Sequence, residues 1–108
     1  MSVKVELNEK NKVLIAMISG DVDHHSAKSI RSEIDSTIEQ YQPNQTVLDF
    51  SGVTFMDSSG IGLVMGRYKI MQSIGGTVVI QNPPNHIKKV MQLAGLDKIA
   101  TINNIKVG

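Results

Sequence analysis

The residues best placed to do chemistry lie in one short stretch, Asp57-Ser58-Ser59-Gly60. It falls between an apolar run at 46–48, typical of a buried strand, and residues 61–74, whose pattern predicts a helix. A serine in this position displays its hydroxyl beside the unpaired N–H groups of a helix N-terminus. It also lies at the carboxyl end of a strand, where ligands and partners of open α/β sheets usually dock. Ser58 is therefore the leading candidate functional residue.

One possible role for Ser58 is that of a hydrolytic nucleophile. A serine hydrolase needs a G-x-S-x-G elbow and a histidine base, but Met56 occupies the position of the first glycine. The histidines (His24, His25 and His86) show no spacing that indicates a catalytic triad. Adjacent His24 and His25 would diverge by about 100° on a helix, and no thiol or acidic cluster completes a metal shell. We therefore expect no catalytic residues and no metal site.

A second possible role is nucleotide binding, because residues 60–66 form a G-x-G-x-x-x-G string after a strand. The first glycine, however, falls well past the strand, and Gly62 and Gly66 lie within the predicted helix. The next strand ends in Gln81 rather than in the acid that would hold a ribose. No P-loop is present, so we expect no cofactor. A small nucleotide-binding or hydrolytic protein that uses Ser58 and Asp57 is kept as the alternative.

The third possible role makes Ser58 a residue that is modified by another protein. A phosphate would add about −1.5 to −2 charges. The helix N-terminus would favour that charge by about 0.3–1 kcal/mol, while Asp57 would repel it. The main effect would fall on a partner docked over the loop, which would have to desolvate or pair the new charge. Judged from the residues alone, the simpler interpretation that Ser58 and Ser59 only cap the helix is favoured.

Strands and helices alternate along the rest of the chain. Residues 3–7 alternate apolar and polar side chains, as in an edge strand, and can form a hairpin with the next strand. That next strand, at 12–19, is an unbroken apolar run, which predicts burial on both faces. Asp23 is a candidate cap for a helix over 24–40. The pattern predicts a single α/β domain over residues 1–108, with a mixed, mostly parallel sheet of four to five strands and helices packed against it.

The C-terminal third continues this alternation. A buried strand is predicted at 77–80, and Asn85 is a candidate cap for a third helix that ends at Gly95. The tail carries apolar residues that can pack but form too short a segment to assign: Ile99, Ile102, Ile105 and Val107.

The helix predicted at 61–74 has apolar residues on two nearly opposite sides. We expect the second side to pack on a neighbouring helix, although an external partner is the alternative. Gly62 and Gly66 each cost about 1 kcal/mol relative to alanine inside a helix. Close packing on the sheet and a smooth strip for a partner's backbone are both open as reasons for these glycines.

Composition limits the choice of function further. The chain has 108 residues, of which 41% are hydrophobic and 19% charged, a balance typical of globular domains. A net charge of +1 favours neither nucleic acid nor an acidic membrane as partner. There is no cysteine, no signal-peptide pattern at the N-terminus and no apolar run of the roughly 18 residues that span a bilayer. We therefore expect a cytoplasmic protein.

Several segments together resemble a known family. They are Gly20-Asp21-Val22-Asp23-His24-His25, Val47-Leu48-Asp49-Phe50-Ser51, Phe55-Met56-Asp57-Ser58-Ser59-Gly60-Ile61-Gly62, Gly66-Arg67-Tyr68-Lys69, Gly75-Gly76 and Leu93-Ala94-Gly95-Leu96. With this order and these flanks, the chain resembles the STAS domain family over its whole length. More narrowly, it is similar to the bacterial anti-sigma factor antagonists, and most of all to those of sporulating bacteria.

The resemblance implies a regulatory function rather than an enzyme. In this family the serine directly after the loop aspartate is phosphorylated by the anti-sigma factor, which is itself a serine kinase. The unphosphorylated antagonist binds that kinase and frees the sigma factor, and a PP2C-type phosphatase restores the phosphorylated form. The matching phosphoacceptor is Ser58. Asp57, Ser59, Gly60 and Gly62 would shape the docking loop, and Asp23 and His24 would be nearby contacts. The same switch in a general stress response is the alternative pathway.

Overall fold

The computed structural model describes residues 2–104 as five strands, three α-helices and one short 3-10 helix. In chain order these are β1 (Ser2–Asn8), β2 (Val13–Val22), α1 (His24–Tyr41), β3 (Gln45–Met56), α2 (Ser58–Ser73), β4 (Thr77–Gln81), α3 (Asn85–Leu93), η1 (Leu96–Lys98) and β5 (Thr101–Asn103). The predicted tail positions Ile105 and Val107 lie outside the described residues.

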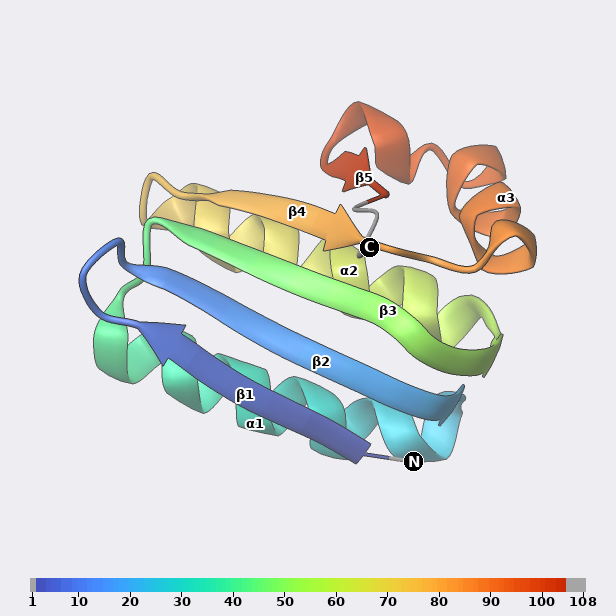
Figure 1. Cartoon of the computed structure of the whole chain (residues 1–108), viewed down its shortest axis with the longest axis horizontal. Coiled ribbons are helices and arrows are strands. Elements are labelled where there is room, and N and C mark those ends of the chain that lie inside the picture. Colours follow the sequence, from blue (N-terminus) through green and yellow to red (C-terminus); the bar gives the residue numbers. More distant parts are fainter. Residues whose placement is uncertain (1, 105–108) are drawn as a thin grey trace.

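The strands form one sheet in the order β1-β2-β3-β4-β5 (Figure 1). β1 pairs antiparallel with β2, so the predicted hairpin is confirmed. All other neighbours are parallel, which confirms the predicted mixed, mostly parallel sheet. Because β2 and β3 are parallel neighbours, the helices that follow them begin at the same edge of the sheet.

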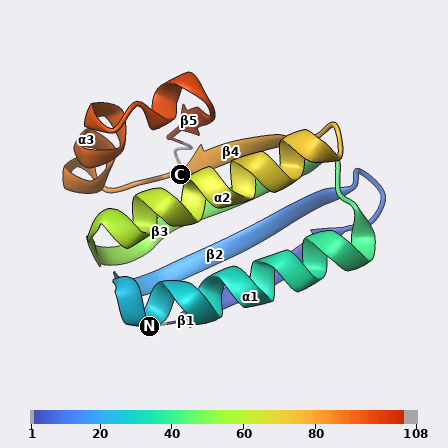
Figure 2. The same cartoon turned by 180° about the vertical axis from the view of Figure 1, so that it is seen from behind.

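Helices α1 and α2 lie side by side on one face of the sheet, and the other face carries no helix of the described chain (Figures 1 and 2). The prediction that the second strand is covered on both faces is therefore wrong. Leu14, Ala16 and Ile18 point into the core, whereas Val13, Ile15 and Met17 alternate with them and stay partly exposed. An unbroken apolar run thus serves a strand with one buried face and one half-buried face.

The core is built from this single layer of helices on the sheet. α1 contributes Ile30, Ile34 and Ile38, which recur at four-residue steps and are all buried. α2 packs on β3, β4 and α1, so the expected helix neighbour for its second apolar side is confirmed. None of the helices described in residues 2–104 is long and apolar enough to cross a membrane.

The boundaries around the central stretch differ from those predicted. Most of the segment between the predicted strand at 46–48 and the predicted helix at 61–74 is strand, because β3 continues beside β2 as far as the pair Val22 and Met56. Irregular register between β2 and β3 accommodates this extension, and Asp49 accepts hydrogen bonds from the N–H and hydroxyl of Ser51 where the strand bends. α2 begins at Ser58 rather than at residue 61, so Asp57 alone separates strand from helix.

The start of the third helix is also different from the prediction. α3 begins at Asn85, its N-cap position is Pro84, and no side chain caps it, so the expected cap by Asn85 is wrong. The fixed φ of proline and the preceding proline at 83 position the chain for the helix turn without a side-chain bond. Gly95, with φ +80°, ends this region as predicted.

Candidate functional site

Two helix N-termini lie at the same edge of the sheet, and each has an aspartate as its N-cap. At α1, the Asp23 carboxylate accepts hydrogen bonds from the N–H groups of His25 (3.0 Å) and Ser26 (2.8 Å). Ser26 returns a bond, because its hydroxyl accepts from the Asp23 N–H at 3.0 Å and donates to the Asp21 carbonyl at 2.9 Å. This is a complete capping box, and it confirms Asp23 as the cap. The N–H of Ser26 is the largest of the hydrogen-bond effects that hold the pKa of Asp23 below its usual value.

The start of α2 is simpler. Asp57 accepts one side-chain bond, from the N–H of Ser59 at 2.8 Å. The backbone N–H of Asp57 donates to the Val22 carbonyl at 3.1 Å, which ties this turn to the end of β2. Asp57, rather than Ser58 or Ser59, is therefore the cap, and the interpretation that the serines only cap the helix is wrong.

The two serines differ in their surroundings. Ser58 is the first residue of α2 and is exposed. Within residues 2–104 its hydroxyl has no hydrogen-bond partner. Ser59 is partly buried and faces α1. An enzyme that approaches from solvent can thus reach the Ser58 hydroxyl more easily than that of Ser59.

Gly60 has a structural reason to lack a side chain. It is buried, and a Cβ at this position would overlap the side chain of Met56. A larger residue would push the first turn of α2 away from the end of β3. Gly60 therefore lets the first turn of α2 lie close to the end of β3, and because it is buried it offers no surface to a partner.

Gly62 and Gly66 behave differently from Gly60. A Cβ at either position would meet no atom within 4 Å, so close packing on the sheet does not explain these glycines. Gly62 is exposed in a row with Ser58 and Met65, at the three- and four-residue spacing of one helix face. We call Ser58, Gly62 and Met65 the α2 ridge. Met65 is 43% exposed, so the ridge presents an apolar side chain to solvent.

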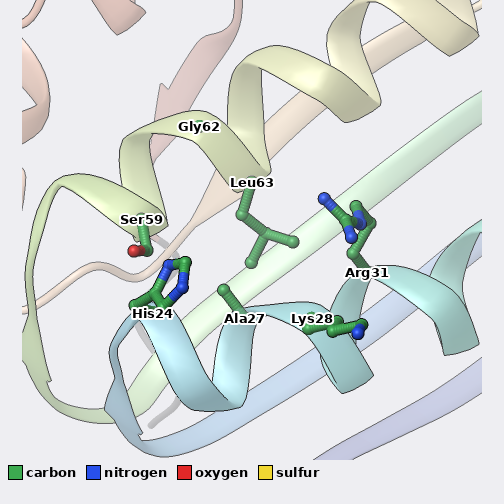
Figure 3. A pocket seen from close by; sticks show the side chains of 7 residues that line it. All are labelled: His24, Ala27, Lys28, Arg31, Ser59, Gly62 and Leu63. Carbon is green, nitrogen blue, oxygen red and sulfur yellow. The ribbon is translucent and has the colours of Figure 1, made fainter.

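A groove of about 310 Å³ separates the first turns of α1 from those of α2 (Figure 3). It is lined by His24, Ala27, Lys28 and Arg31 of α1 and by Ser59, Gly62 and Leu63 of α2. The predicted site residues His24, Ser59 and Gly62 thus meet around one hollow, and Arg31 extends toward α2 (Figure 3). Asp23 and Asp57 lie just outside it, as the caps of the two helices.

The groove ends where a buried ion pair joins the helices. Arg67 of α2 is only 3% exposed, and its Nε lies 2.7 Å from Oδ1 of Asp35 on α1. Burial raises the pKa of Asp35, although the positive charges of Arg67 and Arg31 oppose that shift. The pair fixes one helix against the other at mid-length.

Lys28, Arg31, Asp35 and Arg67 were not identified from the sequence as site residues. The position of Arg67 in the sequence could have indicated its burial, because it falls between Val64 and Met71 in the buried stripe of α2. His24, Lys28 and Arg31 also follow helical spacing, but only the packing of α1 on α2 shows that they border a groove. Among the described residues, no group of three or more histidine or acidic side chains could hold a metal ion.

Comparison with known proteins agrees with this architecture. The STAS domain model matches residues 4–106. An anti-sigma F factor antagonist from Paenibacillus polymyxa is 36% identical, with 99% of this chain and 92% of that protein covered.

Two solved structures of the antagonist SpoIIAA are also similar. The unphosphorylated form matches with a TM-score of 0.82 and 29% identity, over 94% of this chain and 88% of that chain. The phosphorylated form, from Bacillus, matches with a TM-score of 0.74 and 29% identity, over 94% of this chain and 91% of that chain. With a matching family model over nearly all its length and this level of identity, the chain belongs to the STAS domain family, in its group of anti-sigma factor antagonists.

Proposed function

We propose that this protein is a phosphorylation-controlled antagonist of an anti-sigma factor that is also a serine kinase. The unphosphorylated form binds the kinase through the α2 ridge and the adjoining groove, and so frees the sigma factor. Phosphorylation of Ser58 ends that binding, and a PP2C-type phosphatase reverses it. With these partners the protein would act in the cytoplasm, in the control of sporulation.

One observation carries this proposal: Ser58 is exposed, has no hydrogen-bond partner among the described residues and occupies the first position of α2. The fold does not need its hydroxyl, since Asp57 already caps the helix. A phosphate there lies beside the positive end of the helix, which stabilises negative charge by about 0.3–1 kcal/mol. The folded domain can therefore accept the phosphate, and the main effect of the phosphate is on partner binding at the docking surface.

The size of that effect follows from where the charge falls. A phosphate of about −1.5 to −2 charges on the α2 ridge would have to be desolvated under a docked partner. An unpaired charge in an interface typically costs several kcal/mol, more than the helix terminus returns. Binding is thus switched by electrostatics on a rigid surface.

The proposal is tested by incubating the protein with its cognate anti-sigma kinase and ATP, followed by intact-mass spectrometry and mapping of the site. We expect one added phosphate, on Ser58, that is absent in Ser58→Ala and retained in Ser59→Ala. The Ser59→Ala variant is the matched control because it removes the neighbouring hydroxyl on the same turn. A phosphate on Ser59, or none on the wild type, would contradict the assignment.

A further inference from the structure

We propose that the groove between α1 and α2 binds an acidic segment of the kinase partner. This inference rests on the proposed function, since it names the chemistry of the surface that the α2 ridge meets. The groove is directly continuous with that ridge, because Gly62 belongs to both.

The side chains that line the groove carry positive charge. Its lining includes the cations of Lys28 and Arg31 and the imidazole of His24, and it includes no carboxylate. Over residues 2–104, the side-chain ion pairs are Lys4 with Glu6 and Arg67 with Asp35, so neither Lys28 nor Arg31 has one.

Nearby carboxylates lie outside the lining of the groove and keep their negative charge, but their close contacts are with other groups. Asp23 and Asp57 accept hydrogen bonds from the N–H groups of their own helices. Asp35 lies near both Arg31 and Arg67, but its close contact is with the buried Arg67. The negative charge of Asp35 therefore acts on both Arg31 and Arg67, and Arg31 has no ion pair of its own among the described residues.

The backbone adds to this field. α1 and α2 both begin at this edge of the sheet, so the positive ends of two helix dipoles, each capped by an aspartate, flank the groove. The hollow is open and, at about 310 Å³, at the small end of ligand pockets. An open hollow of this size can admit one or two acidic side chains of a docked protein.

This charge also suggests how the switch gains strength. Ser58 precedes the groove residue Ser59 on the same turn. A phosphate on Ser58 would reduce the positive potential that attracts the acidic segment, in addition to blocking the ridge. Attraction and release then depend on the same local field.

The chemistry is tested directly by zero-length crosslinking of the complex with a carbodiimide. The reagent activates a partner carboxylate, the Lys28 amine attacks it, and an amide forms as the reagent leaves as its urea. Mass spectrometry should find Lys28 joined to an Asp or Glu of the kinase. Lys28→Arg keeps the charge and should keep binding, but it removes the amine and this crosslink. A complex that forms without any crosslink at Lys28 would overturn the proposal.

Charge reversal gives a second test, by titration with the kinase at low and high salt. We expect Lys28→Glu to bind about tenfold more weakly at low salt, with most of the difference lost at high salt. Lys10→Glu is the matched control, since Lys10 is exposed in the turn at 9–12, at the other end of β2. Equal weakening by both variants would indicate only an effect of net charge and would overturn the groove assignment.

The two proposals fail in different ways. If wild type binds and is phosphorylated on Ser58 but Lys28→Glu binds as wild type does, the groove proposal falls and the function stands. If wild type itself neither binds nor is phosphorylated, the proposed function falls. If ADP or inorganic phosphate protects the Lys28 amine from reaction and the kinase alone does not, the groove is a phosphate site. That result would overturn the acidic-segment proposal.

Discussion

The starts of α1 and α2 are built on the same plan and differ in what they leave free. Each follows a parallel strand, and each has an aspartate cap, Asp23 or Asp57. At α1 the third helical residue is Ser26, which is buried and bonded to Asp23 and Asp21. At α2 the corresponding residue is Gly60, which packs on Met56, and the exposed serine comes two positions earlier.

The difference separates a structural helix start from one suited to regulation. The hydroxyl of Ser26 in α1 is occupied by the hydrogen bonds of the capping box, so it cannot be modified without unfolding the turn. The cap of α2 uses only the aspartate, and this leaves the Ser58 hydroxyl to solvent. A modifiable serine on a rigid helix end thus requires that another residue does the capping.

The largest expected effect on the free energy of unfolding is at Gly60, the third residue of α2. Gly60→Ala should lower the free energy of unfolding by about 2 kcal/mol, because the new Cβ overlaps the Met56 side chain. Urea denaturation measures this. Gly62→Ala is the control on the same helix, and it should instead stabilise the protein by about 0.5–1 kcal/mol because its Cβ meets no atom within 4 Å. If Gly60→Ala is as stable as wild type, the packing argument for Gly60 is wrong.

The corresponding position of α1 should show a somewhat smaller effect. Ser26→Ala leaves the Asp23 N–H and the Asp21 carbonyl without their hydroxyl partner, and we expect a loss of about 1–1.5 kcal/mol. Thermal and urea unfolding check the value. Phosphorylation of Ser58 in this variant should proceed as in wild type, so a loss of phosphorylation without a loss of stability would contradict the division between the two helix starts.

The aspartate cap of α1 should also make stability depend on pH. The pKa of Asp23 is lowered in the folded protein, so its ionised form stabilises the fold above the usual value of 3.8. That contribution is lost as pH falls through the lowered pKa. The difference in unfolding free energy between wild type and Asp23→Asn should therefore be constant near neutral pH and shrink below about pH 4. If the difference in unfolding free energy instead grows on acidification, the lowered pKa of Asp23 is contradicted.

The smallest expected effect on stability is at Ser58 itself. Ser58→Ala removes an exposed hydroxyl with no partner among residues 2–104, so the free energy of unfolding should change by less than about 0.5 kcal/mol. Calorimetry of Ser58→Ala beside Ser26→Ala gives the contrast in one experiment. Equal losses in the two variants would show that Ser58 is structural after all.

Local features of this fold were predictable because each depends on neighbours in sequence. Asp23 precedes an apolar stripe of period 3.6, and this pattern is enough to predict a capped helix. The alternation of strands and helices similarly predicts the mixed sheet. Ser58 could be singled out because it lies between a strand and a helix.

Features that depend on tertiary packing were not predictable in the same way. The length of β3 depends on its pairing with β2 as far as Val22, and no local signal marks that end. The open face of the sheet could not be read from β2, whose apolar run is the same for one covered face or two. The groove depends on how Arg67 and Asp35 hold α2 against α1, which brings Lys28 and Arg31 beside Ser59.

The central claim is that charge on the exposed serine of α2 controls partner binding while the fold stays intact. It is tested most directly by titrating the cognate kinase with unphosphorylated protein and with protein phosphorylated only on Ser58, whose folded state is checked by circular dichroism. We predict that the phosphorylated protein binds at least about tenfold more weakly with an unchanged spectrum. Equal affinity of the two forms, or weaker binding accompanied by unfolding of α2, would contradict the claim.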